Sequence, residues 1–159
     1  MSLDIEPILD SIGQDIIAEM QDNLEKNKPG RDWSSMASGD LYGSFQTEIK
    51  NNILEITSSV DYSGDVDLGM PPKEVDKSAI VQWIANKGFQ GRNKFTGKFM
   101  SRENVAFLIS RKLKARGYSG INYVLNTFET LKDHIEESVT KGYAKKIEET
   151  LEQNISKKM

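Results

Sequence analysis

The sequence of 159 residues contains no cysteine and a single histidine. Without cysteine the chain has no disulfide, zinc–thiolate site or thiol nucleophile, so its fold depends on packing alone. The absence of cysteine is also typical of proteins synthesised in the cytoplasm. The histidine, His134, lies among charged residues, which favours a solvated imidazole over a metal ligand or general base. A Ser-His-Asp triad would need His134, and no serine stands in a G-x-S-x-G motif.

Long hydrophobic runs are also absent, because charged residues interrupt every apolar segment. No stretch approaches the roughly 18 to 20 apolar residues of a transmembrane helix, so we expect no membrane partner. Residues 1–6 are acidic and lack the regions of a signal peptide, so we expect no export by that route. Hydrophobic residues make up 37% and charged residues 28%, which predicts a single domain over 1–159 with a modest core and long solvated helices.

Motifs for phosphate and metal binding are incomplete. The segment from Gly91 resembles a phosphate-binding loop, but five residues instead of four precede its second glycine, Gly97, and Phe99 stands where Ser or Thr would hold magnesium. Five acidic residues between positions 61 and 76 lack the spacing of a calcium-binding EF-hand. We favour an acidic surface loop facing a basic neighbour over a calcium site for this set: Asp61, Asp65, Asp67, Glu74 and Asp76. We predict no catalytic, metal-binding or cofactor-binding residues, no cofactor, and a protein that is not an enzyme.

The N-terminal part of the chain predicts a helix followed by a β-hairpin. Apolar residues recur every four positions and predict a helix over 3–27, ended by Pro29-Gly30. Alternating apolar residues on both sides of Asn51-Asn52 predict a hairpin near 44–60. The two prolines at the end of 61–72 favour a loop there.

Two shorter helices have recognisable ends. Asp76 is a suitable N-cap for a helix that ends at Gly88, and Ser101 for one that ends at Gly117. Between them lies a linker, residues 89–100, that is rich in glycine and lysine. The sequence therefore predicts an α+β fold, with a small antiparallel sheet flanked by helices.

A long C-terminal helix is predicted over 123–158, either unbroken or with a break near Asn126-Thr127. A helix of roughly 30 residues reaches about 45 Å, which exceeds what a core of this size covers. Its apolar stripe therefore meets either another chain or the N-terminal helix as an antiparallel partner, and both contacts can coexist.

Charge is unevenly distributed along the chain. Between positions 87 and 117, nine basic residues stand against the single acid Glu103, so this segment carries +8. Because the whole chain carries −3, the remainder carries −11. The nine are Lys87, Arg92, Lys94, Lys98, Arg102, Arg111, Lys112, Lys114 and Arg116. Such a surface favours head-to-tail packing of like subunits or contact with nucleic acid, unless the basic residues merely solvate a helix and loop.

The candidate contact residues follow from this segment. For a partner or DNA they are Arg92, Lys94, Lys98, Arg102, Arg111 and Lys112. The aromatic residues of the linker alternate with basic ones, and either stack on bases or anchor the loop on a core or neighbour. The candidate interface anchors are Phe95, Phe99 and Trp83, although a tryptophan such as Trp83 is more often a core residue.

The order of motifs resembles a small family of neck and tail-completion proteins of tailed bacteriophages. The residues that carry it are SGDLYGSF at 38–45, DY at 61–62, VDLG at 66–69, PP at 71–72, IVQWIANKG at 80–88 and the segment 107–117 with its closing Arg-Gly. This core spans 38–117, and the terminal helices match the family only by pattern. The linker 89–100 is longer than in the family.

The resemblance implies a minor structural protein of the virion, made in the host cytoplasm and placed in the neck or tail. It implies a homo-oligomeric ring where head and tail meet, around the channel through which DNA passes. Expected partners are further copies of the chain and other neck, portal or tail proteins, with non-specific contact to DNA in the channel. The alternative from the residues alone is a nucleic-acid-binding module that uses the basic segment 87–117.

Overall fold

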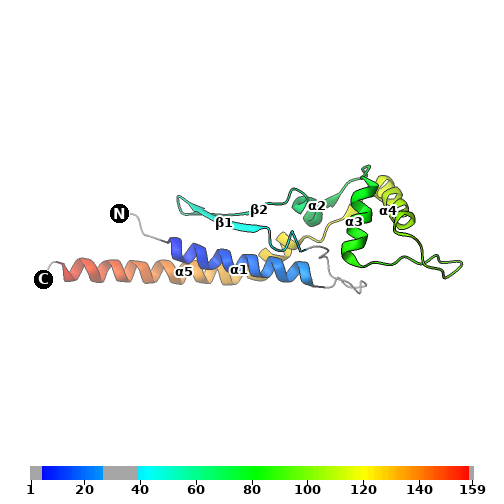
Figure 1. The fold of residues 1–159 in the computed structure, drawn as a ribbon. Helices are drawn as coiled ribbons and strands as arrows, with labels where there is room; N and C mark the ends of the chain where they lie inside the picture. Colours follow the sequence, from blue (N-terminus) through cyan, green and yellow to red (C-terminus); the bar gives the residue numbers. More distant parts are fainter. Residues whose placement is uncertain (1–4, 27–38, 158–159) are drawn as a thin grey trace. The chain divides into compact units, whose positions relative to one another are not determined.

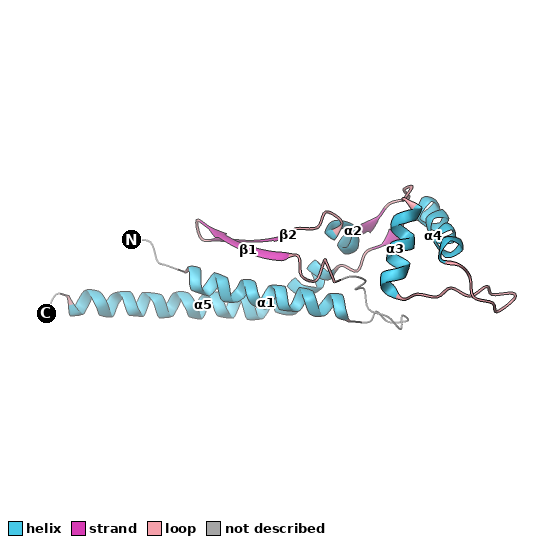
Figure 2. Cartoon of the chain, in the orientation of Figure 1, coloured by secondary structure: helices cyan, strands magenta, loops and turns pink. Residues whose placement is uncertain are grey.

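The computed structural model describes residues 5–26 and 39–157, and within them the fold is α+β, as predicted (Figure 1). Its helices and strands are coloured by type in Figure 2. In chain order they are α1 (Glu6–Glu25), β1 (Phe45–Lys50), β2 (Ile53–Ser58), α2 (Ser63–Leu68), β3 (Gly69–Met70), α3 (Lys77–Lys87), α4 (Arg102–Arg116), β4 (Tyr118–Ser119) and α5 (Tyr123–Ser156). The outer ends of both predicted terminal helices, the Pro29-Gly30 pair and Ser38 lie outside the described residues.

Contacts group the chain into two compact units. The long-helix unit comprises Met1–Asn23, Ser44–Ser59 and Tyr123–Met159. The basic unit comprises Leu24–Gly43 and Val60–Asn122. The single domain expected over 1–159 stays a prediction.

In the long-helix unit, α1 and α5 pack as antiparallel partners (Figure 1). Asn23 Nδ2 donates to Thr127 Oγ1 at 3.0 Å, and Asp15 Oδ2 lies 2.9 Å from His134 Nε2. Ile8 lies against Gly142. Residue numbers rise along α1 as they fall along α5, which confirms the antiparallel pairing that the sequence offered for the N-terminal helix.

The predicted hairpin is confirmed and packs on α1. Strands β1 and β2 are antiparallel, and Asn51 and Asn52 form the two-residue turn with φ of 52° and 61°. Positive φ at both turn residues matches the right-handed twist of the strands, and asparagine tolerates it. Gly13 of α1 makes room for the sheet, since a Cβ there would lie 2.9 Å from Thr47 Cγ2 and 3.2 Å from Leu54 Cδ1.

The C-terminal helix α5 is unbroken over 34 residues, about 50 Å at 1.5 Å per residue. The alternative of a break near Asn126-Thr127 is wrong, because Thr127 lies inside the continuous helix. Its Oγ1 donates to the Tyr123 carbonyl oxygen at 2.8 Å, so the buried hydroxyl is satisfied within the helix.

In the basic unit, α3 and α4 pack around a small core and have the predicted ends. The core consists of Ile80, Ile84, Val105 and Ala106. The Asp76 carboxylate accepts from the Ser78 amide at 2.9 Å, and Ser101 Oγ accepts from the Asn104 amide at 3.2 Å. Both helices end at glycines of positive φ, which L-residues adopt only with strain.

The loop predicted over 61–72 is wrong, because this stretch forms α2 and β3. Strand β3 pairs with β4, about fifty residues away, with Gly69 opposite Ser119. The backbones approach so closely that a Cβ at Gly117 or Gly120 would overlap carbonyl oxygens of the opposing segment. Local pattern reading misses such a pairing, since its partner is distant in sequence and its key residues lack side chains.

Candidate interaction surfaces

The linker between α3 and α4 folds into a small hairpin, residues 91–100, which we call the basic finger (Figure 1). The Asn93 amide donates to the Lys98 carbonyl oxygen at 2.9 Å, and the Met100 amide donates to that of Gly91 at 2.9 Å. Arg92 and Phe99 form an antiparallel bridge. Gly91 lets the finger lie close to α4, because a Cβ there would be 2.6 Å from Val105 Cγ2.

The tip of the finger is held by one asparagine side chain. Asn93 Oδ1 accepts from the amides of Phe95 at 2.9 Å and Thr96 at 3.1 Å. The Gly97 amide donates to the Asn93 carbonyl oxygen at 2.8 Å, and Gly97 has a φ of 68°. These bonds fix the turn without help from a core.

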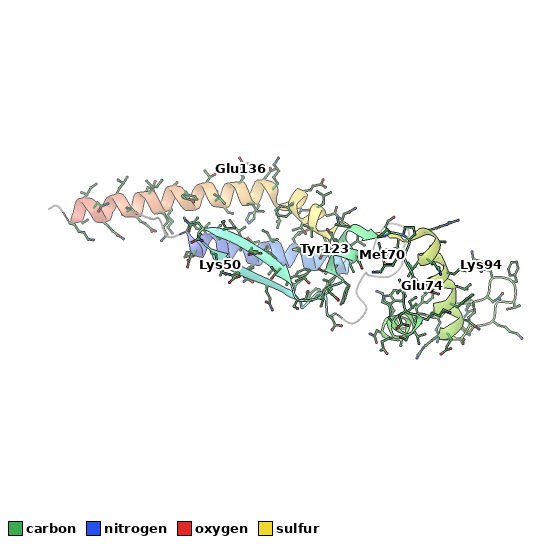
Figure 3. All side chains as sticks on the ribbon, turned by 90° about the horizontal axis from the view of Figure 1, so that it is seen from above. Lys50, Met70, Glu74, Lys94, Tyr123 and Glu136 are labelled. Atoms are coloured by element: carbon green, nitrogen blue, oxygen red, sulfur yellow. The ribbon has the colours of Figure 1, made fainter. Side chains whose placement is uncertain are left out.

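The finger presents an apolar residue between cations. Phe95 is 100% exposed. Lys94 lies at the outer end of the finger (Figure 3), and Lys98 is exposed as well. Within the part of the chain that the structure describes, neither lysine forms an ion pair. An exposed ring flanked by unpaired cations is typical of a contact surface.

Arg92 and Phe99, the remaining basic and aromatic residues of the finger, contact each other. The Arg92 guanidinium lies 4.2 Å from the centroid of the Phe99 ring, a cation–π contact. Phe99 remains 61% exposed. The structure thus brings together five of the predicted contact and anchor residues on the finger: Arg92, Lys94, Phe95, Lys98 and Phe99.

The remaining predicted residues lie elsewhere in the basic unit. Arg102 begins α4 and follows the finger directly. Arg111 is nine residues further along, two and a half turns of helix, and therefore lies on the opposite face of α4 with Lys112 beside it. Trp83 is half-buried against the α3–α4 core, and its role as an interface anchor stays a prediction.

Of the acidic residues considered for a calcium site, Asp76 and Glu74 have structural roles in the basic unit. Asp76 caps α3, and its hydrogen bonds from Ser78 lower the pKa of its carboxyl group. Glu74 pairs with Lys114 at 3.1 Å, while Asp67 is buried. Tyr118 donates to the Asp65 carbonyl oxygen, and burial raises the pKa of Tyr118. Among residues 5–26 and 39–157, no group of three potential ligands could hold a metal ion.

A cavity of about 460 Å³ lies at the base of the finger in the basic unit. Its apolar walls come from Ile84, Phe89, Phe99, Met100 and Val105. Arg102 is the one ionisable residue among those that line it.

A second surface is the apolar row at the end of α5, which we call the C-terminal stripe: Tyr143, Ile147, Leu151 and Ile155. Their exposed fractions rise along the helix from 37% through 47% and 56% to 60%. In the register of α1 on α5, the numbers of facing residues add up to 149 or 150, as for Asp15 with His134 and Asn23 with Thr127. Glu6, the first residue of α1, therefore faces about position 144, and the described part of α1 does not reach further along α5.

Two carboxylates flank the C-terminal stripe. Glu148 and Glu152 are exposed, one helical turn apart, and no ion pair engages either of them in the described ranges. Lys146, on the other flank, already pairs with Glu149 at 3.6 Å. The stripe is thus apolar with one acidic side, which the sequence pattern of apolar spacing alone does not reveal.

The charges divide between the two units. The long-helix unit contains seven basic and fifteen acidic residues, a net −8, and the basic unit contains fourteen basic and nine acidic residues, a net +5.

In the described residues, no helix combines the length and the apolar character needed to cross a membrane. Comparison with protein-family models, curated proteins and solved structures finds no match.

Proposed function

We propose that this chain is a structural protein of a tailed-bacteriophage virion, a neck or tail-completion subunit that forms a homo-oligomeric ring around the DNA channel. The observation that carries this role is the order of family-like motifs along one α+β chain. The motif at 38–45 leads into β1, 61–72 covers α2 and β3, 80–88 falls on α3 and 107–117 on α4. These segments also supply the C-cap glycines of α3 and α4 and two residues of their core, Ile80 and Ile84.

Exposed surface supports self-association. The C-terminal stripe is a continuous apolar row that the described part of α1 leaves uncovered, and such rows are typical of protein interfaces. The opposite net charges of the two units favour contacts between unlike surfaces of neighbouring copies.

Light scattering and negative-stain imaging of the purified protein test the ring. We expect a mass that is a whole multiple of 17.9 kDa and particles with an open centre, alone or after addition of portal or tail proteins. A strict monomer under both conditions would exclude the ring.

Nucleic-acid binding is the second candidate, favoured by the exposed Phe95 between Lys94 and Lys98. Bases stack on aromatic rings while phosphates attract lysine, and such binding weakens steeply with salt. Replacing Lys94, Phe95 and Lys98 by alanine should then abolish salt-sensitive binding to a single-stranded oligonucleotide. Lys73→Ala with Lys132→Ala is the control, since it removes two exposed charges outside the segment 87–117 and leaves the finger intact.

A further inference from the structure

We propose that the basic finger of one copy docks on the C-terminal stripe of a second copy. In this contact Phe95 packs on the stripe. The lysines beside it, Lys94 and Lys98, pair with two carboxylates of the second copy. Those carboxylates belong to Glu148 and Glu152. This inference rests on the proposed ring, because it names the contact between its neighbouring subunits.

The finger is preorganised for docking. Phe95 is fully exposed, although burial of an aromatic ring stabilises an interface. Asn93 fixes the turn through the amides of Phe95 and Thr96, so little conformational freedom is lost on docking. A ring held rigidly in solvent is well placed to enter an apolar surface.

The C-terminal stripe offers an exposed apolar surface on which Phe95 can pack. Ile147 and Leu151 are one turn apart and about half exposed. Gly142, which contacts Ile8 of α1, lies about 140° around the helix from Ile147, at 100° per residue. The stripe therefore faces away from α1 within the long-helix unit and is open to a further chain.

Charge complementarity selects this occupant. Glu148 and Glu152 are about 6 Å apart along α5, from the rise of 1.5 Å per residue, and lie on one side of the stripe. They lack ion pairs within the described residues, as do Lys94 and Lys98 of the finger. An apolar centre with two cations thus meets an apolar centre with two anions.

The two surfaces belong to different parts of the chain, so the contact is head-to-tail. Each copy offers one finger and one stripe, and it binds one neighbour through each. Such a heterologous contact closes into a ring when its rotation divides a full turn, and otherwise forms a filament. A ring therefore needs no second type of interface.

Charge reversal tests the contact. The finger-reversed variant carries Lys94→Glu and Lys98→Glu, and the stripe-reversed variant carries Glu148→Lys and Glu152→Lys. In each variant alone, the finger of one copy and the stripe of the next carry charges of the same sign and repel each other. We therefore expect the association constant, measured by analytical ultracentrifugation, to fall at least about tenfold. An equimolar mixture should recover association, because each reversed surface then meets its opposite. Lys73→Glu with Lys132→Glu, at two exposed lysines outside the predicted contact residues, is the matched control and should associate like the wild type.

The outcomes separate this contact from the proposed function. If both reversed variants form rings as the wild type does, the finger–stripe contact is refuted but the proposed ring is not. A wild type that is monomeric at all concentrations and with portal or tail proteins would refute both. Loss of oligonucleotide binding in the finger-reversed variant, with unchanged self-association, would assign the finger to nucleic acid and overturn the inference. Circular dichroism of each variant checks that it is folded.

Discussion

Ile8 of α1 lies directly over Gly142 of α5, so that a Cβ atom at position 142 would be 2.5 Å from Ile8 Cδ1 and 2.9 Å from Cγ1. This contact fixes how closely the two helices approach. It also fixes their register, together with the Asp15–His134 and Asn23–Thr127 contacts. The length of α5 that remains uncovered depends on that register.

Replacing Gly142 with leucine should destabilise the long-helix unit by about 1–3 kcal/mol, because the new side chain displaces Ile8. Urea unfolding followed by circular dichroism measures the change. Ala144→Leu, two residues away on an exposed part of α5, serves as control and should change the free energy of unfolding by less than about 0.5 kcal/mol. Equal effects of the two substitutions would contradict the close approach at Gly142.

Gly120→Ala should destabilise the basic unit by about 2 kcal/mol or more, since its methyl group would overlap the Asp67 carbonyl oxygen. Gly64→Ala is a matched control in the same unit, because a Cβ at Gly64 meets nothing within 4 Å. The melting temperatures of the two variants, measured by thermal unfolding, compare their stabilities. If Gly120→Ala melts like Gly64→Ala, the backbone contact between α2 and the segment after β4 is not as described.

The turn at Asn51-Asn52 gives a third prediction. Asn52 has a φ of 61°, which a β-branched residue adopts only at a cost of roughly 1–2 kcal/mol. Asn52→Val should therefore lower the stability of the hairpin by that amount, and Asn52→Gly should raise it slightly. Differential scanning calorimetry measures both, and an unchanged melting temperature in Asn52→Val would rule out the positive φ.

Acid should weaken the cap of α3. The hydrogen bonds from Ser78 hold the pKa of Asp76 below the ordinary value of 3.8, so its stabilising contribution is complete above that pH and is lost as the pH falls through the lowered pKa. The asparagine side chain of Asp76→Asn keeps a hydrogen-bond acceptor for the Ser78 amide but has no carboxyl group to titrate. The stability difference between wild type and Asp76→Asn should therefore shrink as the pH falls below about 4. A difference that stays constant from pH 7 to pH 3 would contradict the assignment; Asp61→Asn controls for removing one exposed charge.

A mixing experiment tests the direction of the finger–stripe contact. Phe95→Asp blocks the finger, and Leu151→Asp blocks the stripe. Because each variant keeps the surface that the other lacks, the mixture should form a one-to-one dimer that does not grow, while each variant alone stays monomeric. Larger assemblies in the mixture, measured by mass photometry, would indicate a contact between like surfaces.

Local signals in the sequence account for the parts of the fold that were predicted. Asp76 and Ser101 cap helices within a few residues of themselves, and Asn51-Asn52 forms its turn with adjacent strands. The pairing of β3 with β4 was missed because it joins segments about fifty residues apart through glycines. The sequence left open a break of α5 near Asn126-Thr127, but the Thr127 hydroxyl bonds within the continuous helix.

The candidate surfaces were predicted only in part, for a similar reason. Composition identified the basic residues of 89–100, but the order of the finger depends on the Asn93 side chain and on a φ of 68° at Gly97. The spacing of four along α5 indicated an apolar face, but that its C-terminal part faces away from α1 follows from the contact of Ile8 with Gly142. Long-range packing of this kind leaves no local pattern.

The order of the finger tip also has a kinetic consequence. Since Asn93 already holds the turn, docking of the finger on another copy needs no preceding folding step. The lysines would then govern how fast two copies meet, and added salt would slow their encounter. Phe95, which is desolvated only after contact, would govern how long they stay together, so the lifetime of the pair should be nearly independent of salt.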